Sequence, residues 1–226
     1  MSTLLKIECL DKLNHHVDGL APTKMPFFPS KIHACGRSGS GKGSTVKQLL
    51  LTAVPAYDKI YLIHYAPEST DEWDDCDLSG KFTVGDWPDD PGELLDRNLK
   101  NAAVCDELAF EGMSGKNRGK IDRLVNMASS HFGASVFILQ QNLTSVPPSI
   151  RRACMNDWLI YWPGNDAASM QYVSRKTGHD MKALKSLYKT KYGSITIDGS
   201  GNGVPLRFNL FTEIADSEDN DESKTC

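Results

Sequence analysis

One short glycine-rich segment constrains the fold of this 226-residue chain more than any other part of its sequence. It reads Gly36-Arg37-Ser38-Gly39-Ser40-Gly41-Lys42 and directly follows Lys31–Cys35, an apolar stretch typical of a buried strand. Apolar residues at helical spacing come next, namely Val46, Leu49, Leu50 and Ala53. A glycine-rich loop between a strand and a helix directs backbone N–H groups and the positive end of the helix dipole at a phosphate. The segment therefore predicts a phosphate-binding loop.

The loop departs from the usual motif at its last position. That motif ends in a lysine followed by serine or threonine, and here Gly43 follows Lys42. The hydroxyl that is missing is normally a protein ligand of Mg²⁺. Ser44 and Thr45 come next, with Ser44 one residue out of register. We expect Gly36–Thr45 to bind ATP, Lys42 to reach its β- and γ-phosphates, and Mg²⁺ to be held through water or by Ser44.

Two acidic residues end a later apolar stretch. Asp106 and Glu107 follow Asn101–Cys105, which has the composition of a buried strand. An aspartate at the end of a strand can orient the shell of ligands around Mg²⁺. The neighbouring glutamate can act as a general base on the attacking water. An isolated pair of this kind is usually a surface feature, but beside a phosphate loop it indicates hydrolysis of a γ-phosphate.

Amides and arginines follow the next apolar stretch, Ser135–Leu139. Gln140, Gln141 and Asn142 end this strand, where an amide can hydrogen-bond the γ-phosphate or the attacking water. Arg151 and Arg152 come soon after Pro147-Pro148, on a short predicted helix. An arginine from a neighbouring subunit could stabilise the transferred phosphoryl group, and a surface or DNA-facing role is equally open. Three other arginines compete for the same role: Arg118, Arg123 and Arg175.

The remaining pattern favours one α/β domain. Further strands are predicted over 60–65 and 158–162, and 193–197 with 206–210 flank the turn of a β-hairpin. Residues 66–96 are predicted to form loops and short helices, and the glycine-rich segment 112–119 is predicted to be mobile. An amphipathic helix is indicated by Met181, Leu184, Leu187 and Tyr188. Alternating strands and helices predict a mostly parallel sheet with helices on both faces. We expect 1–30 to be an extension packed on the core, 31–214 the ATPase domain, and 215–226 a disordered acidic tail.

Charge and cysteine content narrow the functional class. The net charge is −4, yet residues 151–192 carry eight basic residues against three acidic ones, as a nucleic-acid-binding face would require. A solvated helix surface explains the same charges. The six cysteines are scattered without a C-x-x-C pair, which favours buried thiols in a reducing, intracellular compartment. The sequence has neither an apolar run of membrane-spanning length nor a secretion signal.

Together these motifs resemble the genome-packaging ATPases of the FtsK–HerA superfamily, of the poxvirus-like type found in large double-stranded DNA viruses. Three blocks carry the resemblance: the loop from His33 to Lys42, the strand Ala102–Glu107, and Ser135–Asn142 followed by Val146–Arg151. The ending, with Ile195–Asp198 and Pro205–Phe208, is also similar. The resemblance spans about Lys31 to Phe211.

The resemblance implies a RecA-like P-loop ATPase that moves double-stranded DNA into a capsid. It implies a homo-oligomeric ring, of five or six subunits, acting at a capsid or portal vertex, in the virion or at the site of virus assembly in the host cell. Lys42, Asp106, Glu107 and Gln141 match the loop lysine, metal acid, catalytic acid and sensor of the family. Arg151 matches a family arginine. Ser129-Ser130-His131 stands where relatives often have Arg-His, which weakens any assignment of the arginine finger.

Two other functions stay open. A kinase of the nucleoside monophosphate type would explain the sequence Gly41-Lys42-Gly43-Ser44, because such kinases have a similar loop. It would also need an arginine-rich lid and an acceptor pocket, and neither is clear in the sequence. A non-catalytic module that binds nucleotide as an assembly switch would bind ATP without turnover.

Overall fold

The computed structural model describes residues 4–6, 20–22, 28–53, 56–164, 166–178, 180–186, 192–199, 206–208 and 212–213. In chain order its strands are β1 (Leu4–Lys6), β2 (Leu20–Pro22), β3 (Lys31–Cys35), β4 (Lys59–His64), β5 (Gly80–Phe82), β6 (Asn101–Asp106), β7 (Ala134–Gln140), β8 (Trp158–Tyr161), β9 (Ile195–Asp198), β10 (Leu206–Phe208) and β11 (Thr212–Glu213). Its helices are α1 (Lys42–Leu51), α2 (Gly115–His131), α3 (Pro148–Met155), α4 (Ala167–Thr177) and α5 (Met181–Ser186). Short 3-10 turns form η1 (Pro67–Ser69), η2 (Pro91–Glu93) and η3 (Leu143–Ser145).

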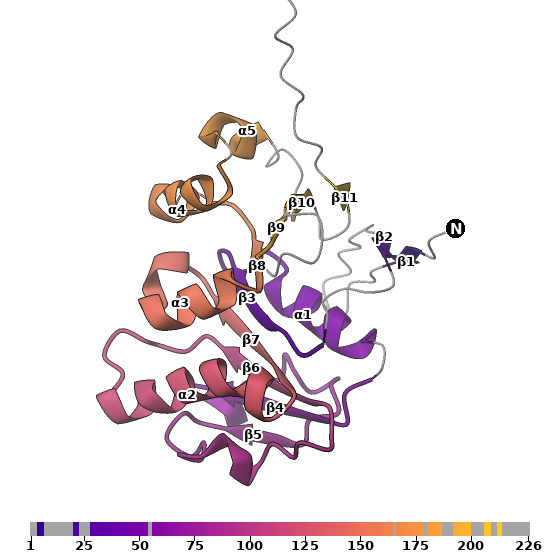
Figure 1. Ribbon diagram of the computed structural model, residues 1–226, viewed down its shortest axis with the longest axis vertical. Helices are drawn as coiled ribbons and strands as arrows, with labels where there is room; N and C mark the ends of the chain where they lie inside the picture. Colours follow the sequence, from indigo (N-terminus) through magenta and orange to yellow (C-terminus); the bar gives the residue numbers. More distant parts are fainter. Residues whose placement is uncertain are drawn as a thin grey trace, which may run out of the picture.

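Most strands of the described residues belong to one twisted sheet. Their order is β11-β10-β9-β8-β3-β7-β6-β4-β5. The strands from β8 to β5 run parallel, and β9, β10 and β11 are added antiparallel at one edge. Strand β3, which leads into the glycine-rich loop, lies between β7 and β8 (Figure 1). The prediction of a mostly parallel sheet is confirmed.

The central strands are apolar on both faces because helices cover both faces. Along β7, Val136 and Ile138 pack in a cluster with α2 and α3. The alternate residues, Phe137 and Leu139, pack in a second cluster with α1. Figure 1 shows α1 on one face of the sheet and α2 with α3 on the other. This is the pattern of a parallel sheet buried on both sides, where successive side chains point to opposite faces.

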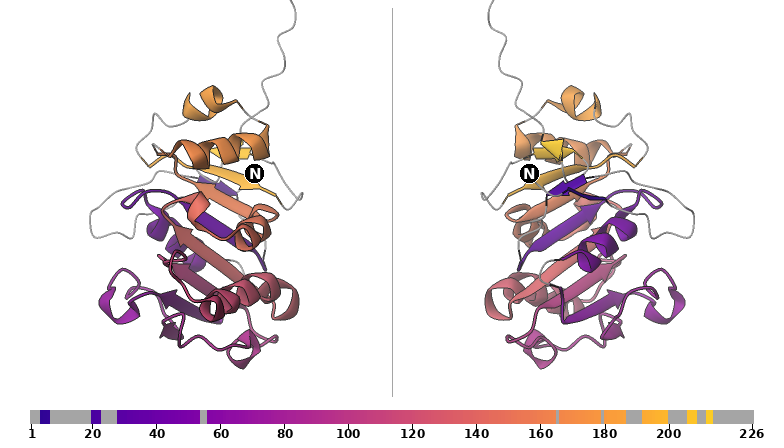
Figure 2. Two further views of the ribbon diagram at one scale, coloured as in Figure 1. Left: turned by 90° about the vertical axis from the view of Figure 1, so that its left-hand side faces the viewer. Right: turned by 90° about the vertical axis from the view of Figure 1, so that its right-hand side faces the viewer.

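The antiparallel edge confirms the predicted C-terminal hairpin. Strands β9 and β10 pair with Ile197 opposite Leu206. A third apolar cluster joins β8 and β9 to α4 and α5, which lie at this end of the sheet (Figure 2). Helix α4 was not predicted. It begins where the Asp166 carboxylate accepts hydrogen bonds from the backbone N–H groups of Ala168 and Ser169.

Two segments contain regular structure that was not predicted. Segment 112–119 includes the start of α2 at Gly115, and its predicted mobility stays a prediction. The hydroxyl of Ser114 accepts a hydrogen bond from the backbone N–H of Asn117, and this cap offsets the low helix propensity of glycine. The acidic stretch 66–96 contains a strand, β5, that pairs with β4 at the edge of the sheet.

The structure describes the two ends of the chain only in part. Strands β1 and β2 pair with each other outside the main sheet, and packing of 1–30 on the core stays a prediction. The predicted acidic tail, 215–226, lies outside the described residues.

The cysteines of the described residues are free and buried, as expected, and burial raises the pKa of the Cys35 thiol to about 12. Within the described ranges, no helix has the length and apolar character needed to cross a membrane.

Candidate nucleotide-binding site

The glycine-rich loop curls over the start of α1, as its motif predicts. Gly39 and Gly41 have φ values of +69° and +98°, in a region that residues with a Cβ rarely adopt. Helix α1 then begins at Lys42, and the backbone N–H of Thr45 donates to the carbonyl of Gly41 at 2.9 Å. The N-terminus of α1 therefore faces the loop, which is the arrangement that binds phosphate.

The side chain of Lys42 is buried at the loop, where its amine donates to a main-chain carbonyl. Only 7% of its surface is exposed, and Nζ donates to the carbonyl oxygen of Arg37 at 3.1 Å. Burial lowers the pKa of Lys42, whereas the carboxylates of Asp106 and Glu107 act in the opposite direction. A phosphate oxygen can replace the single carbonyl contact with a stronger, charge-assisted one.

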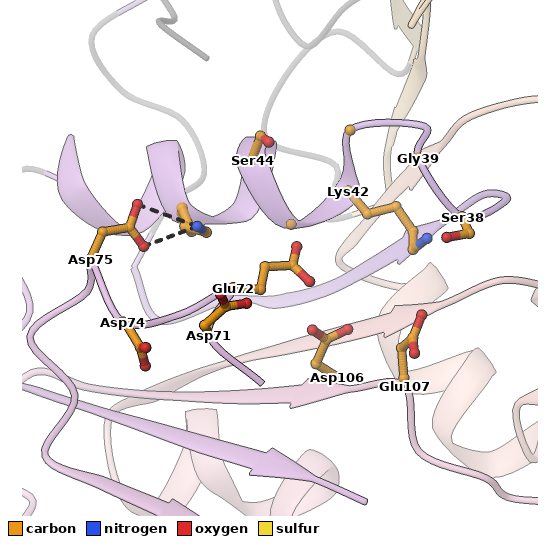
Figure 3. Close-up of a pocket in the computed structure, with 13 residues that line it drawn as sticks. Ser38, Gly39, Lys42, Ser44, Asp71, Glu72, Asp74, Asp75, Asp106 and Glu107 are labelled. Atoms are coloured by element: carbon orange, nitrogen blue, oxygen red, sulfur yellow. Dashed lines mark hydrogen bonds and ion pairs between the residues drawn. The ribbon is translucent and has the colours of Figure 1, made fainter. Parts of the chain in front are cut away.

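Asp106 and Glu107 lie where β6 ends. Asp106 is 4% exposed and accepts a hydrogen bond from the indole Nε1 of Trp73 at 2.9 Å. Burial raises the pKa of Asp106, and the Trp73 hydrogen bond and the charge of His64 oppose this rise. Glu107 has a φ of +49°, a strained conformation that costs about 1 kcal/mol or more outside glycine. The turn directs both carboxylates toward the loop (Figure 3).

The two glutamines that end β7 have different environments. Gln140 is buried, and its Nε2 donates to the carbonyl of Leu108 at 3.1 Å. Gln141 is exposed, and its Nε2 lies 3.5 Å from Oε1 of Glu107. Gln140 is the last residue of β7, and Gln141 is the first residue after the strand. The structure brings Gln141 together with Glu107, and its predicted role as a sensor of the γ-phosphate stays a prediction.

A cavity of about 670 Å³ joins the loop to these acids (Figure 3). Its size suits a nucleotide-sized ligand. The lining residues are Ser38, Gly39, Gly41, Lys42, Gly43, Ser44, Lys47, Asp71, Glu72, Asp74, Asp75, Asp106 and Glu107. A second cavity, of about 470 Å³, borders the loop at Gly36 and Arg37 and reaches Gln141.

Segment 71–75, for which no functional role was predicted, forms one wall of the cavity. Trp73 is buried, and its indole also donates a hydrogen bond to Asp106. Lys47 of α1 forms an ion pair with Asp75 at 2.9 Å, and its Nζ lies 5.8 Å from the centre of the Trp73 ring. The segment therefore bridges α1 and β6. Its sequence signal was only a tryptophan within an acidic stretch.

Two residues that were predicted to belong to the site, Ser44 and Arg151, do not point toward its acidic residues. Ser44 borders the cavity, but its hydroxyl projects from the side of α1 away from Glu72 and Asp106 (Figure 3). Successive helical residues differ by about 100° around the axis, so Gly43 and Ser44 cannot face the acids together.

Arg151 of α3 does not line the cavity. Its guanidinium lies 4.8 Å from the centre of the Tyr172 ring and 3.5 Å from the carbonyl of Leu143. A role for Arg151 in a neighbouring subunit stays a prediction.

The donor set suits Mg²⁺ bound together with a nucleotide. Among the described residues, no three His, Cys, Asp or Glu side chains gather in a way that would hold a metal alone. Mg²⁺ is typically held by one or two carboxylates, water and substrate phosphates, so such a cluster is not required. Asp106 and its neighbours along this wall supply the carboxylates that such a site needs.

Comparison with known proteins adds structural neighbours only. The sequence matches no protein-family model and no curated protein. Among solved structures, the DNA-packaging ATPase B204 of Sulfolobus turreted icosahedral virus is similar, with a TM-score of 0.56 and 14% identity over 84% of this chain and 100% of that one. B204 from the related virus 2 is described in complex with ATP-γ-S.

Two larger ATPases are also similar. The conjugation coupling protein TcpA of pCW3 matches with a TM-score of 0.57 and 14% identity, over 96% of this chain and 67% of TcpA. A chain holding ATPases 2 and 3 of EssC from Geobacillus thermodenitrificans matches with a TM-score of 0.58 and 11% identity, over 96% of this chain and 46% of that one. At these identities the similarity establishes the fold. The chain has the RecA-like P-loop ATPase fold.

Proposed function

We propose that this chain is an ATP-hydrolysing motor that moves double-stranded DNA into a viral capsid. The observation that carries the hydrolytic part of the proposal is the 3.5 Å contact between Gln141 and Glu107, beside the cavity that Lys42 lines. A phosphate-binding lysine, a carboxylate and an amide that reaches it are the groups that hydrolysis of a γ-phosphate requires. A binding module alone would not require the last two.

Each residue has a distinct role in the proposed reaction. Lys42 exchanges the carbonyl of Arg37 for the β- and γ-phosphate oxygens of ATP. Glu107 accepts the proton of the attacking water, and Gln141 orients that water and Glu107. Asp106, fixed by Trp73, orients the ligands of Mg²⁺. Bound Mg²⁺ would neutralise charge on the phosphates during transfer.

The DNA-moving part of the proposal is supported by the neighbours and by charge. B204 is a viral DNA-packaging ATPase, and it shares the fold of this chain. Helices α4 and α5 carry exposed basic residues at the β9 end of the sheet (Figure 2), namely Arg175, Lys176, Lys182 and Lys185. Exposed lysine and arginine side chains can bind the phosphates of DNA without reading its sequence.

The assembly is also proposed. The subunits form a homo-oligomeric ring of five or six copies, of the poxvirus-like type within the FtsK–HerA superfamily, at a capsid or portal vertex. The protein acts inside the host cell or in the virion. Because Arg151 lies outside the cavity of its own subunit, it acts in this proposal on the nucleotide of a neighbouring subunit.

The test is ATPase activity with and without double-stranded DNA, together with the oligomeric mass. We expect DNA to accelerate phosphate release, and Lys42→Ala and Glu107→Gln each to lower kcat by about 10²-fold or more. Glu111→Gln is the matched control, because Glu111 is exposed and outside the cavity. Unchanged turnover in both site variants would overturn the assignment.

The same assay separates the alternatives. A kinase of the nucleoside monophosphate type would release no phosphate until an acceptor nucleotide is added, and DNA would have no effect. An assembly switch would bind ATP with Mg²⁺ and show no turnover. A monomer whose ATPase activity ignores DNA would contradict a packaging motor.

A further inference from the structure

The side chain of Glu72 occupies the space beside Gly43 that a side chain at position 43 would take. A Cβ placed on Gly43 would overlap Oε1 of Glu72 and would lie 3.1 Å from its carboxyl carbon. A serine or threonine could therefore not occupy position 43 unless Glu72 moved. The carboxylate of Glu72 fills the volume that the side chain of the usual hydroxyl residue would take. Figure 3 shows this carboxylate between α1 and Asp106.

Contacts of the residues that follow Glu72 hold the backbone of its segment in place. Trp73, the next residue, is completely buried and donates its indole hydrogen bond to Asp106 of β6. Asp75 forms an ion pair with Lys47, one helical turn after Gly43 on the same helix. The backbone that carries Glu72 is therefore fixed to both elements that form the site. The bridge fixes the backbone at Glu72, whose side chain lines the cavity.

We propose that Glu72 replaces the missing hydroxyl as the protein ligand of the Mg²⁺ that binds with the nucleotide. The proposal rests on the nucleotide-binding function proposed above. A carboxylate oxygen is a preferred ligand of Mg²⁺, and one such ligand beside the phosphates and water completes a usual coordination shell. Ser44, the hydroxyl nearest in sequence, points away from this position (Figure 3).

The assignment explains why glycine is found in the loop. Gly43 leaves room for a carboxylate that reaches the site from a distant segment, so the two residues act as a pair. Lys42 and Lys47 also line this cavity and offset the negative charge that Glu72 adds next to the phosphates. The carboxylate of Glu72 and a hydroxyl side chain at position 43 are then alternative ligands for Mg²⁺, and only one of them fits at a time.

The experiment measures binding of the β,γ-imido analogue of ATP by calorimetry, with Mg²⁺ and with Mg²⁺ removed by chelation. In the parent protein, Mg²⁺ should tighten analogue binding. In Glu72→Gln, this tightening should fall about tenfold or more, while binding without Mg²⁺ stays equal or becomes stronger because one negative charge is lost. Glu111→Gln is the matched control, since Glu111 is exposed and lies outside the cavity.

A rescue experiment isolates the pair. Gly43→Ser alone should weaken Mg²⁺-dependent binding because its Cβ overlaps Glu72. Gly43→Ser combined with Glu72→Ala should bind better with Mg²⁺ than Glu72→Ala alone, because the hydroxyl then has room. This non-additivity is not expected if Glu72 only supports the fold.

The outcomes are distinguishable. If the parent requires Mg²⁺ for tight binding and Glu72→Gln requires it equally, the role of Glu72 is overturned while nucleotide binding stands. If the parent protein does not bind the analogue with Mg²⁺, the proposed function fails and this inference fails with it.

Discussion

The two walls of the nucleotide cavity are built in different ways. The loop wall is positioned by the main chain: β3 lies between β7 and β8, and Gly39 and Gly41 provide the turn. The acidic wall, 71–75, is positioned by side chains, through the Trp73–Asp106 hydrogen bond and the Lys47–Asp75 ion pair. Main-chain geometry leaves a motif in the sequence, whereas isolated side-chain contacts leave none. The first wall should respond to changes in the buried core, and the second to single polar substitutions.

The largest expected effect concerns the loop wall and His33 in β3. His33 is completely buried, and neither ring nitrogen has a hydrogen-bond partner within the described part of the chain. Burial, aided by the charge of Arg151, lowers its pKa from 6.5 to about 3. Below pH 6.5 the unfolded chain binds a proton that the folded chain cannot, so stability is lost as the pH falls. Between pH 7 and pH 4.5 this loss is about 2.5 kcal/mol.

The measurement is denaturant unfolding of the parent and of His33→Leu at both pH values. The variant should lose about 2.5 kcal/mol less than the parent on acidification. Asp157, whose pKa burial raises to about 6, contributes with the opposite sign, but it is present in both proteins and cancels in the difference. Equal pH dependence in the two proteins would show that His33 is protonated in the fold.

Next in size is Trp73→Phe, which breaks the acidic wall at its hydrogen bond. Phenylalanine keeps an aromatic ring in the core but removes the Nε1 donor to Asp106. Loss of a group that orients a metal-site carboxylate should lower kcat about tenfold. Trp87→Phe is the control, because Trp87 is equally buried, lies on the other face of the sheet, and has no hydrogen-bond partner for Nε1 among the described residues. If both variants lower kcat equally, Trp73 acts by packing alone.

These two walls also explain what the sequence could predict. Lys42, Asp106 and Gln141 were predicted because each lies at or next to the end of an apolar strand or in a local motif. The role of Glu72 depends on how a connection between β4 and β5 folds back over α1, which is a tertiary contact without local periodicity. Helix α4 was missed for a related reason. Only Met170 and Val173 are fully buried apolar residues in it, too few for a clear amphipathic pattern.

The smallest effect is expected from Lys47→Met, which separates the acidic wall from α1. The substitution removes the ion pair with the half-exposed Asp75 and the cation–π contact with the Trp73 ring. Methionine keeps most of the apolar stem of the buried lysine. A pair of this kind with a cation–π contact contributes about 1 kcal/mol. Denaturant unfolding should show this loss in 0.05 M salt and a smaller loss in 0.5 M salt, because salt screens the exposed partner.

The matched control separates the wall from surface charge in general. Lys81→Met removes the ion pair with Asp74, which is exposed and does not reach α1. We expect it to change stability by less than about 0.5 kcal/mol and to leave analogue binding with Mg²⁺ unchanged. Lys47→Met should weaken that binding several-fold, since the segment carrying Glu72 loses its attachment to α1. Equal behaviour of the two variants would mean that Trp73 alone holds the acidic wall.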